Sequence, residues 1–228
     1  MSGVNNRPQM VLIDLDGTLI DSVPDLAFCV DALMARLDLP ARGEAKVRQW
    51  VGNGIERLVK RALLDRLDGE PDRELLDKAL PIYFDLYKEN LSRRSRLYPG
   101  VKEGLQFLRG AGYKLGCITN KAAAFTEPLL KDLGIYDYFQ IVVSGDTLPV
   151  KKPDPQPLLH AARFFKVEPN HALMVGDSIS DVKAARAAGF QVVCVSYGYN
   201  HGQDIRDARP DAVIDSMAQL SGLLARAA

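Results

Sequence analysis

Met-Val-Leu-Ile-Asp-Leu-Asp-Gly-Thr, residues 10–18, joins an apolar run to two carboxylates and a glycine. The apolar part, residues 10–13, predicts a buried strand. Ligands of open α/β sheets bind beyond the carboxyl ends of the strands, which is where Asp14 and Asp16 stand. Neighbouring carboxylates repel each other unless a cation or a shared proton relieves them. We therefore predict a magnesium-assisted site, against the alternative of a solvated Asp-x-Asp-Gly turn that needs no metal.

Strand and helix signals alternate along the second half of the chain. Short aliphatic runs at residues 115–118, 141–143, 172–175, 192–195 and 212–214 are separated by helical patterns, as in βαβ units of a parallel sheet. Between the first strand and these runs, helical spacing dominates, with helices expected at residues 44–50, 55–67 and 72–91. Ser22 is a candidate N-cap for a further helix before them.

These patterns predict an α/β fold with a Rossmann-like parallel sheet core and an inserted all-helical cap domain. The core is expected to span residues 10–22 and 95–228, and the cap residues 23–94. Residues 1–9 are polar and are expected to form a flexible tail.

The composition excludes several classes of partner. With 29 acidic and 29 basic residues among 228, no net field favours nucleic acid or an anionic membrane, so a small-molecule partner is expected. Cys29, Cys117 and Cys194 show no CxxC spacing, which argues against disulfides and a zinc site. No apolar run reaches the roughly 20 residues of a membrane span and no signal peptide is visible. We expect a cytoplasmic protein, a monomer or a homodimer.

Three further polar clusters follow predicted strands: Thr119-Asn120-Lys121, Lys151-Lys152-Pro153, and the segment from Gly176-Asp177-Ser178 to Asp181. Each has an ordinary alternative. Thr119 or Asn120 can be a helix N-cap, a lysine before proline is usually at the surface, and Asp177 and Asp181 suit the start of a helix. Because all the clusters would meet at one edge of one sheet, a common site is the better interpretation.

The motifs Asp14-x-Asp16-Gly17-Thr18, Thr119, Lys152-Pro153 and Gly176-Asp177-Ser178-x-x-Asp181 resemble, in order and spacing, the four motifs of the haloacid dehalogenase superfamily. The resemblance is to members with a helical cap after the first motif, and it spans nearly the whole chain. Within the superfamily, residues 17–26, 50–54, 119–121, 145–148 and 151–153 are similar to those of bacterial phosphoglycolate phosphatases.

The resemblance implies Mg²⁺ as cofactor and a role for each aspartate. Asp14 would be the nucleophile and a metal ligand, Asp16 a ligand through its backbone carbonyl, and Asp177 the other carboxylate ligand, with Asp181 supporting them. The side chain of Asp16 would protonate the leaving alkoxide and later accept a proton from water.

The same resemblance implies hydrolysis of 2-phosphoglycolate to glycolate and phosphate through an aspartyl-phosphate at Asp14. Lys152 would balance charge around Asp14 and, with Thr119 and Asn120, bind the phosphoryl group.

Substrate specificity is expected from the cap. Gly52, Asn53 and Gly54 precede a predicted helix whose first N–H groups suit an anion, and Arg57 and Lys121 are further candidate partners. The alternative for each basic residue is a solvated helix face.

Two rival functions remain open. One is another capped phosphatase acting on a sugar phosphate or other small phosphomonoester. The other is a non-enzymatic phosphoacceptor of the receiver type, which is disfavoured because a receiver has no inserted cap and needs no acid such as Asp16.

Overall fold

A six-stranded parallel sheet forms the centre of the protein in a computed structural model that describes residues 7–225. The strand order β5-β4-β1-β6-β7-β8 places β1 between β4 and β6, in the middle of the sheet. Each of the strands predicted from the sequence is present. Their bounds are β1 (Met10–Ile13), β4 (Lys114–Ile118), β5 (Ile141–Val143), β6 (Ala172–Gly176), β7 (Gln191–Val195) and β8 (Ala212–Ile214).

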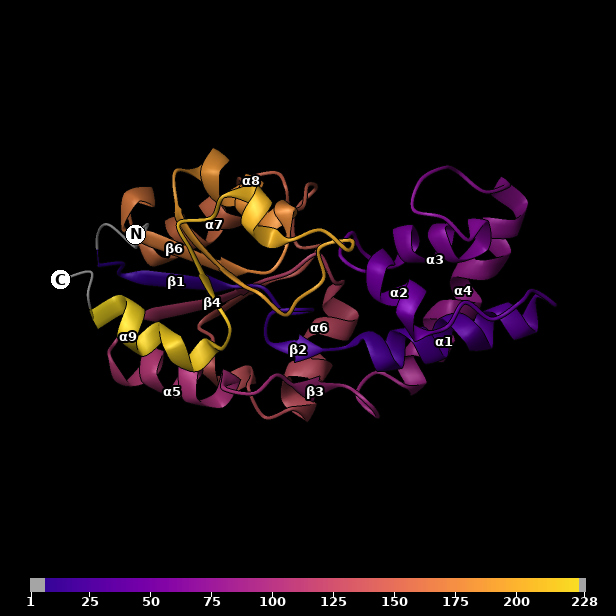
Figure 1. Ribbon diagram of the computed structural model, residues 1–228, viewed down its shortest axis with the longest axis horizontal. Coiled ribbons are helices and arrows are strands. Elements are labelled where there is room, and N and C mark those ends of the chain that lie inside the picture. The colour runs from indigo at the N-terminus through magenta and orange to yellow at the C-terminus, as the bar shows by residue number, and fades with distance from the viewer. Residues whose placement is uncertain (1–6, 226–228) are drawn as a thin grey trace.

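Helices cover both faces of this sheet (Figure 1). Alternate residues of β1 point to opposite faces, with Leu12 in one apolar cluster and Ile13 in the other. The face of Leu12 packs against α7 (Gln156–Phe165) and α8 (Ile179–Ala188). The face of Ile13 packs against α5 (Val101–Gly110), α6 (Ala123–Asp132) and α9 (Leu220–Ala225). Because both faces are buried, the strands are apolar runs without alternation.

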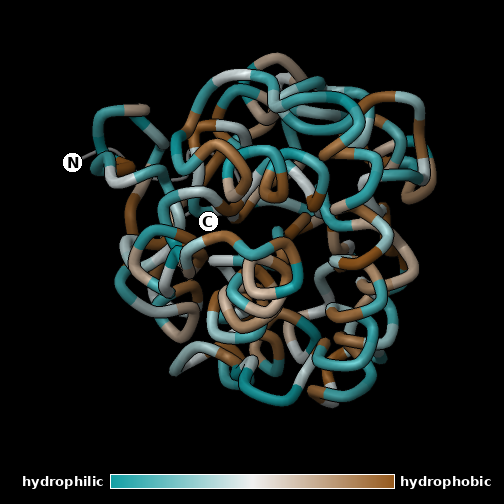
Figure 2. The backbone as a smooth tube through the Cα atoms, turned by 90° about the vertical axis from the view of Figure 1, so that its right-hand side faces the viewer, coloured by the Kyte–Doolittle hydropathy of each residue, from teal (hydrophilic) through white to brown (hydrophobic). Residues whose placement is uncertain are grey.

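A second body, made of helices α1 to α4, lies beside one end of the core, on the right of Figure 1. The view from that end shows hydrophobic and hydrophilic residues alternating along the helical turns, as expected for amphipathic helices (Figure 2). The predicted fold class, a parallel α/β core with an inserted helical cap, is confirmed. We call these helices the cap: α1 (Val23–Arg36), α2 (Glu44–Trp50), α3 (Ile55–Leu64) and α4 (Arg73–Glu89).

The chain enters and leaves the cap through a short antiparallel pair, which we call the junction. It consists of β2 (Ile20–Asp21) and β3 (Arg96–Leu97). Next to it, the fully buried Asp25 of α1 accepts hydrogen bonds from the main-chain N–H groups of Arg94 at 2.9 Å and Ser95 at 2.7 Å. The first turn of the cap is therefore fastened to the segment by which the chain returns to the core.

The structure corrects the predicted end of one helix. The helix expected over residues 55–67 stops at Leu64, because Asp65 takes a left-handed conformation with φ of 52°. The carboxylate of Asp65 pairs there with Lys46 at 2.8 Å. The helix expected over residues 72–91 runs from Arg73 to Glu89, and Asp72 caps it.

Residues 1–6 of the predicted flexible tail lie outside the described residues. Gln9 donates to the main-chain oxygen of His171 at 2.8 Å and accepts from the N–H of Lys114 at 3.1 Å, so it extends the pairing of β1. The three cysteines are buried free thiols, in agreement with the sequence prediction. Within residues 7–225, no helix combines the length and the apolar character that a membrane span requires.

Candidate active site

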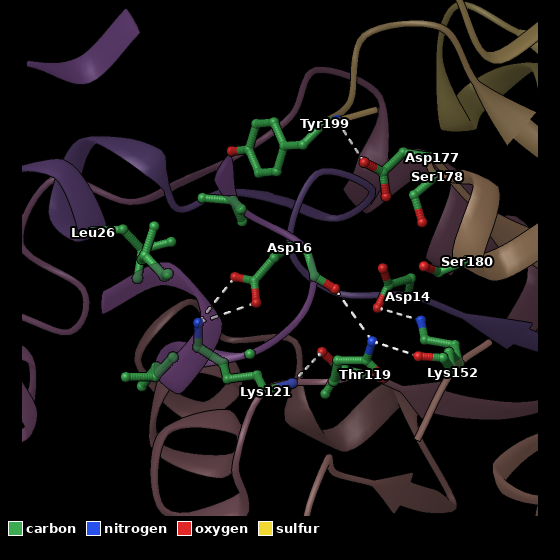
Figure 3. Close-up of a pocket in the computed structure, with 16 residues that line it drawn as sticks. Asp14, Asp16, Leu26, Thr119, Lys121, Lys152, Asp177, Ser178, Ser180 and Tyr199 are labelled. Atoms are coloured by element: carbon green, nitrogen blue, oxygen red, sulfur yellow. Dashed lines mark hydrogen bonds and ion pairs between the residues drawn. The ribbon is translucent and has the colours of Figure 1, made fainter. Parts of the chain in front are cut away.

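The carboxyl ends of the strands and the underside of the cap enclose one cavity (Figure 3). Its volume of about 40 Å³ holds a few water molecules or a small ligand. The core side is polar and the cap side is largely apolar. The core contributes Asp14, Asp16, Thr119, Asn120, Lys121, Lys152, Asp177, Ser178, Ser180 and Tyr199, and the cap contributes Leu26, Val51, Gly52, Gly54, Ile55 and Leu58.

Lys152 is the central cation of the cavity. Its Nζ lies 2.8 Å from Asp14 Oδ1 and 2.7 Å from Asp181 Oδ1, and it donates to the main-chain oxygen of Ile118 at 2.7 Å. Burial alone would lower the pKa of Lys152, but the two carboxylates outweigh burial and raise that pKa. Lys152 is therefore a fixed positive charge, and the alternative of a surface lysine is wrong, since its side chain is buried.

The carboxylates of Asp14, Asp177 and Asp181 form a buried cluster in which one oxygen of each lies within 4.8 Å of the others. Burial raises the pKa of Asp14 to about 7, with Lys152 lowering it and Asp181 raising it. Burial and the charges of Asp181 and Asp14 raise the pKa of Asp177 well above its ordinary value. The cluster therefore has more negative charge than Lys152 can neutralise, as expected for a cation site.

Asp181 has both carboxylate oxygens engaged within the protein. Oδ1 faces Lys152, and Oδ2 accepts from the N–H of Ser178 at 3.1 Å and from its hydroxyl at 2.7 Å. The contact with the Ser178 N–H belongs to a capping box at the start of α8, so the ordinary alternative also holds for Asp181. Asp14 and Asp177 line the cavity, whereas Asp181 is not among the described residues that line it. Asp14 and Asp177 are therefore the carboxylates best placed to hold a cation, and their hard oxygen ligands suit Mg²⁺.

Asp177 is held tightly from two sides. Its Oδ1 accepts from the hydroxyl of Thr18 at 2.9 Å and its Oδ2 from the main-chain N–H of Tyr199 at 2.5 Å. Gly17, with φ of +89°, and Gly198 both approach so closely that a Cβ would come within 2.3 Å and 2.1 Å of Asp177 atoms. Only glycine fits at these two positions.

The side chain of Asp16 faces away from the carboxylate cluster (Figure 3). It accepts from Lys121 Nζ at 3.0 Å and from the hydroxyl of Ser22 at 2.6 Å. Lys121 is almost fully buried, and its Nζ lies 4.9 Å from the centre of the Tyr87 ring. Ser22 stands at the N-cap of α1 as predicted, but its side chain does not cap the helix. Asp14 and Asp16 therefore have separate partners.

Thr119 and Asn120 differ in whether a side-chain hydrogen-bond donor remains for a ligand. The hydroxyl oxygen of Thr119 accepts from the N–H of Lys121 at 3.1 Å, which leaves its proton for a ligand. The amide of Asn120 donates to the main-chain oxygens of Gly52 at 3.2 Å and Lys152 at 3.0 Å, so both of its donors are used. Neither residue caps α6, whose N-cap is Ala122.

Of the residues predicted to recognise the substrate, some line the cavity and others do not. Arg57 pairs with Asp68 at 3.2 Å and with Glu70 at 3.1 Å, and the side chain of Asn53 accepts from Arg61 at 2.9 Å. Neither Arg57 nor Asn53 is among the described residues that line the cavity. The predicted specificity residues that do line it are Gly52, Gly54 and Lys121.

Sequence reasoning missed Tyr199 and Thr18, which orient Asp177, and Leu26, which lines the cavity. Tyr199 follows β7, whose strand was predicted, so the rule that ligands bind beyond strand ends would have pointed to it. Thr18 was part of a recognised motif, but its partner is 159 residues away in the chain.

The fold and the site together define an enzyme of the α/β class with an acidic cavity beneath a helical cap. The sequence model of the haloacid dehalogenase-like hydrolases matches residues 8–189, and the chain belongs to this family.

Two relatives named as phosphoglycolate phosphatases are similar to this chain over almost their whole length. The phosphoglycolate phosphatase of Nitrosococcus oceani is 66% identical over 222 residues, which cover 97% of this chain and 99% of the relative. That of Nitrosospira multiformis is 50% identical, with 94% of each chain covered. The crystal structure of a "predicted phosphoglycolate phosphatase" from Haemophilus somnus superposes with a TM-score of 0.88 at 35% identity, covering 94% of this chain and 97% of the other.

Proposed function

We propose that the protein is a magnesium-dependent phosphatase that hydrolyses 2-phosphoglycolate to glycolate and phosphate. The observation that carries this proposal is the shared position of Asp14, Lys152 and Asp177 in one cavity between the core and the cap. The names of the relatives at 66% and 50% identity support the choice of substrate. Residues 23–94 are proposed to act as the cap that closes over this substrate.

The first chemical problem is the repulsion between two groups of like charge. A carboxylate that approaches a phosphate dianion meets repulsion of about 4 kcal/mol per pair of unit charges at 4 Å, with an effective dielectric constant near 20. Lys152 reduces this repulsion from one side of Asp14. When held by Asp14 and Asp177, with the backbone carbonyl of Asp16, Mg²⁺ supplies further positive charge and polarises the phosphoryl group.

Two aspartates then have separate roles in the transfer of the phosphoryl group. An oxygen of Asp14 attacks phosphorus, the bond from phosphorus to the glycolate oxygen breaks, and an aspartyl-phosphate forms. The carboxyl group of Asp16 is oriented by Lys121 and Ser22, and in its acid form it gives a proton to the leaving alkoxide. The resulting carboxylate then takes a proton from the water that attacks phosphorus, which breaks the bond from phosphorus to the Asp14 oxygen and releases phosphate. Thr119 donates its remaining proton to a phosphoryl oxygen.

The cavity wall favours a small substrate with a second negative charge. On the cap side, Leu26, Ile55 and Leu58 offer no partners for the hydroxyl groups of a sugar. Lys121, the other cation that lines the cavity, faces this wall and suits a carboxylate, together with the first N–H groups of α3 after Gly54. Phosphoglycolate carries such a carboxylate next to its phosphoester.

A panel of phosphorylated metabolites assayed with Mg²⁺ tests the proposal. We expect kcat/KM for phosphoglycolate to exceed that for small sugar phosphates at least about tenfold, or about 1.4 kcal/mol of transition-state binding. The matched control is Asp14→Asn, which keeps the shape of the side chain and removes the nucleophile. A smaller preference would overturn the assignment of substrate.

The same assay separates the phosphatase from a phosphoacceptor. A phosphatase releases inorganic phosphate over many turnovers. Stoichiometric phosphorylation of Asp14 without release of phosphate would instead indicate a receiver-like protein, and hydrolysis that survives in Asp14→Asn would refute the proposed nucleophile.

A further inference from the structure

Tyr199 lies outside the four sequence motifs, in the loop between β7 and the short helix η3 (Ile205–Ala208), and it is 3% exposed. Its main-chain N–H donates to Asp177 Oδ2 at 2.5 Å. Its ring extends away from Asp177 towards the start of the cap (Figure 3). One residue therefore contacts both the carboxylate cluster and the region where the cap begins.

The hydroxyl of Tyr199 is fully engaged at the entry to α1. It accepts from the main-chain N–H groups of Ser22 at 3.1 Å and Val23 at 3.4 Å, and it donates to the carboxylate of Asp21. A tyrosine hydroxyl has one donor and two acceptor sites, so these contacts use all of them. Burial raises the pKa of the Tyr199 phenol, so the donor proton stays in place.

The same group connects to the second helix of the cap. Arg48 of α2 donates to both oxygens of Asp21, at 3.1 Å and 3.2 Å, and lies 5.4 Å from the centre of the Tyr199 ring. Two residues further along the loop, His201 Nδ1 lies 2.7 Å from the main-chain oxygen of Gln49. In Figure 1 this loop extends from the sheet to α2.

The loop also fits closely against Asp177, since a Cβ on Gly198 would come 2.1 Å from the Cβ of Asp177. On the other side, the hydroxyl of Ser22, whose N–H binds Tyr199, donates to Asp16 at 2.6 Å. A shift of the junction would therefore move Asp177 through Tyr199, and Asp16 through Ser22.

We propose that Tyr199 is a positioning residue whose hydroxyl fixes residues 196–200 on the cap junction, so that its N–H orients Asp177 for a divalent cation. The inference rests on the proposed function in one respect, the binding of Mg²⁺ by Asp14 and Asp177. Since such coupling is reciprocal, binding of Mg²⁺ at Asp177 should in turn stabilise the contacts of Tyr199 at the junction.

Calorimetric titration of the substrate-free protein with Mg²⁺ tests this role. Tyr199→Phe keeps the ring and the N–H that binds Asp177 and removes only the hydroxyl. We expect its affinity for Mg²⁺ to fall about tenfold, as for loss of hydrogen bonds that include a charged partner. The matched control is Tyr83→Phe, which removes another buried hydroxyl, one that donates to the main-chain oxygen of Leu26 within the cap at 3.4 Å. Its Mg²⁺ affinity should stay within about twofold of the wild type.

A second pair of variants tests the route from the cap. Arg48→Met should weaken Mg²⁺ binding less than Tyr199→Phe does, and the double variant should bind no more weakly than Tyr199→Phe, because Arg48 acts through the same contacts. Equal Mg²⁺ affinity in Tyr199→Phe and the wild type, with a loss of thermal stability like that of Tyr83→Phe, would overturn the inference. A wild-type protein that does not bind Mg²⁺ would overturn the proposed function as well, so the two failures are distinct.

Discussion

The side-chain amide of Asn120, at the edge of the sheet, lies 3.2 Å from the main-chain oxygen of Gly52, in the loop between α2 and α3. The second proton of the same amide goes to the main-chain oxygen of Lys152. Asn120 therefore joins the cap to the segment that carries the central lysine. Its donors are not free for a phosphoryl group, although the sequence motif suggested that role.

Asn120→Ala is expected to raise KM for phosphoglycolate about tenfold, because one hydrogen bond between cap and core is lost and another within the core. Steady-state kinetics with phosphoglycolate and with a generic aryl phosphate, whose hydrolysis depends less on contacts with the cap, measure this effect. The aryl phosphate should change by no more than about twofold. Equal losses on both substrates would show that Asn120 binds the phosphoryl group instead.

Asp16→Asn is expected to reduce steady-state hydrolysis by about 10²–10⁴-fold, the usual contribution of a general acid and base. An aryl phosphate has a good leaving group that needs little protonation, so the first step should survive better than the second. Rapid-mixing experiments should then show a burst of about one released phenolate per site, followed by very slow turnover. Full steady-state activity would contradict the proposed role of Asp16.

Asp25→Ala is expected to lower the free energy of unfolding by about 3 kcal/mol, because buried N–H groups lose a charged acceptor. Asp25 accepts from the main chain of Arg94 and Ser95, and from the Ser95 hydroxyl at 2.7 Å. Denaturant unfolding measures the change. Asp85→Ala, at an exposed position of α4, should change the stability by less than about 0.5 kcal/mol.

The stability of the metal-free protein should depend on pH through Asp14. Burial raises the pKa of Asp14 from 3.8 to about 7 in the folded protein, so the folded state holds this proton more tightly than the unfolded state does. The resulting stabilisation is complete below pH 3.8 and is lost as the pH rises through about 7. Asp177, whose pKa is also raised, acts in the same direction.

Thermal unfolding in a metal chelator at pH values between about 5 and 8 measures this dependence. The melting temperature should fall as pH rises, and the fall should be smaller in Asp14→Asn, which cannot titrate at that position. Added Mg²⁺ should restore stability at the upper end of the range by binding the folded state. A melting temperature that does not fall with pH in the chelator would contradict the burial of charged groups described here.

The strands of the main sheet could be predicted from sequence because each contains a short apolar run, which is fully buried in β1 and β6. The two-residue strands β2 and β3 could not, because Ile20–Asp21 and Arg96–Leu97 form no such run. The end of α3 could not, since the apolar pattern continues to Leu67 while the backbone of Asp65 turns into the left-handed region. Carboxylates at strand ends were predictable because parallel strands bring them to one edge. The partners of Arg57 were not predictable, because its side chain pairs with Asp68 and Glu70, acidic residues of the cap, and not with a group in the cavity.

The junction of β2 and β3 has a further consequence for the architecture. The chain leaves the core through β2 and returns to it through β3, and these two strands pair with each other. Paired strands lie about 4.8 Å apart. Any segment whose two ends meet at that spacing can be spliced in at this point without disturbing the register of the main sheet. The strands of the core can therefore keep their positions while the length and sequence of the inserted helices vary.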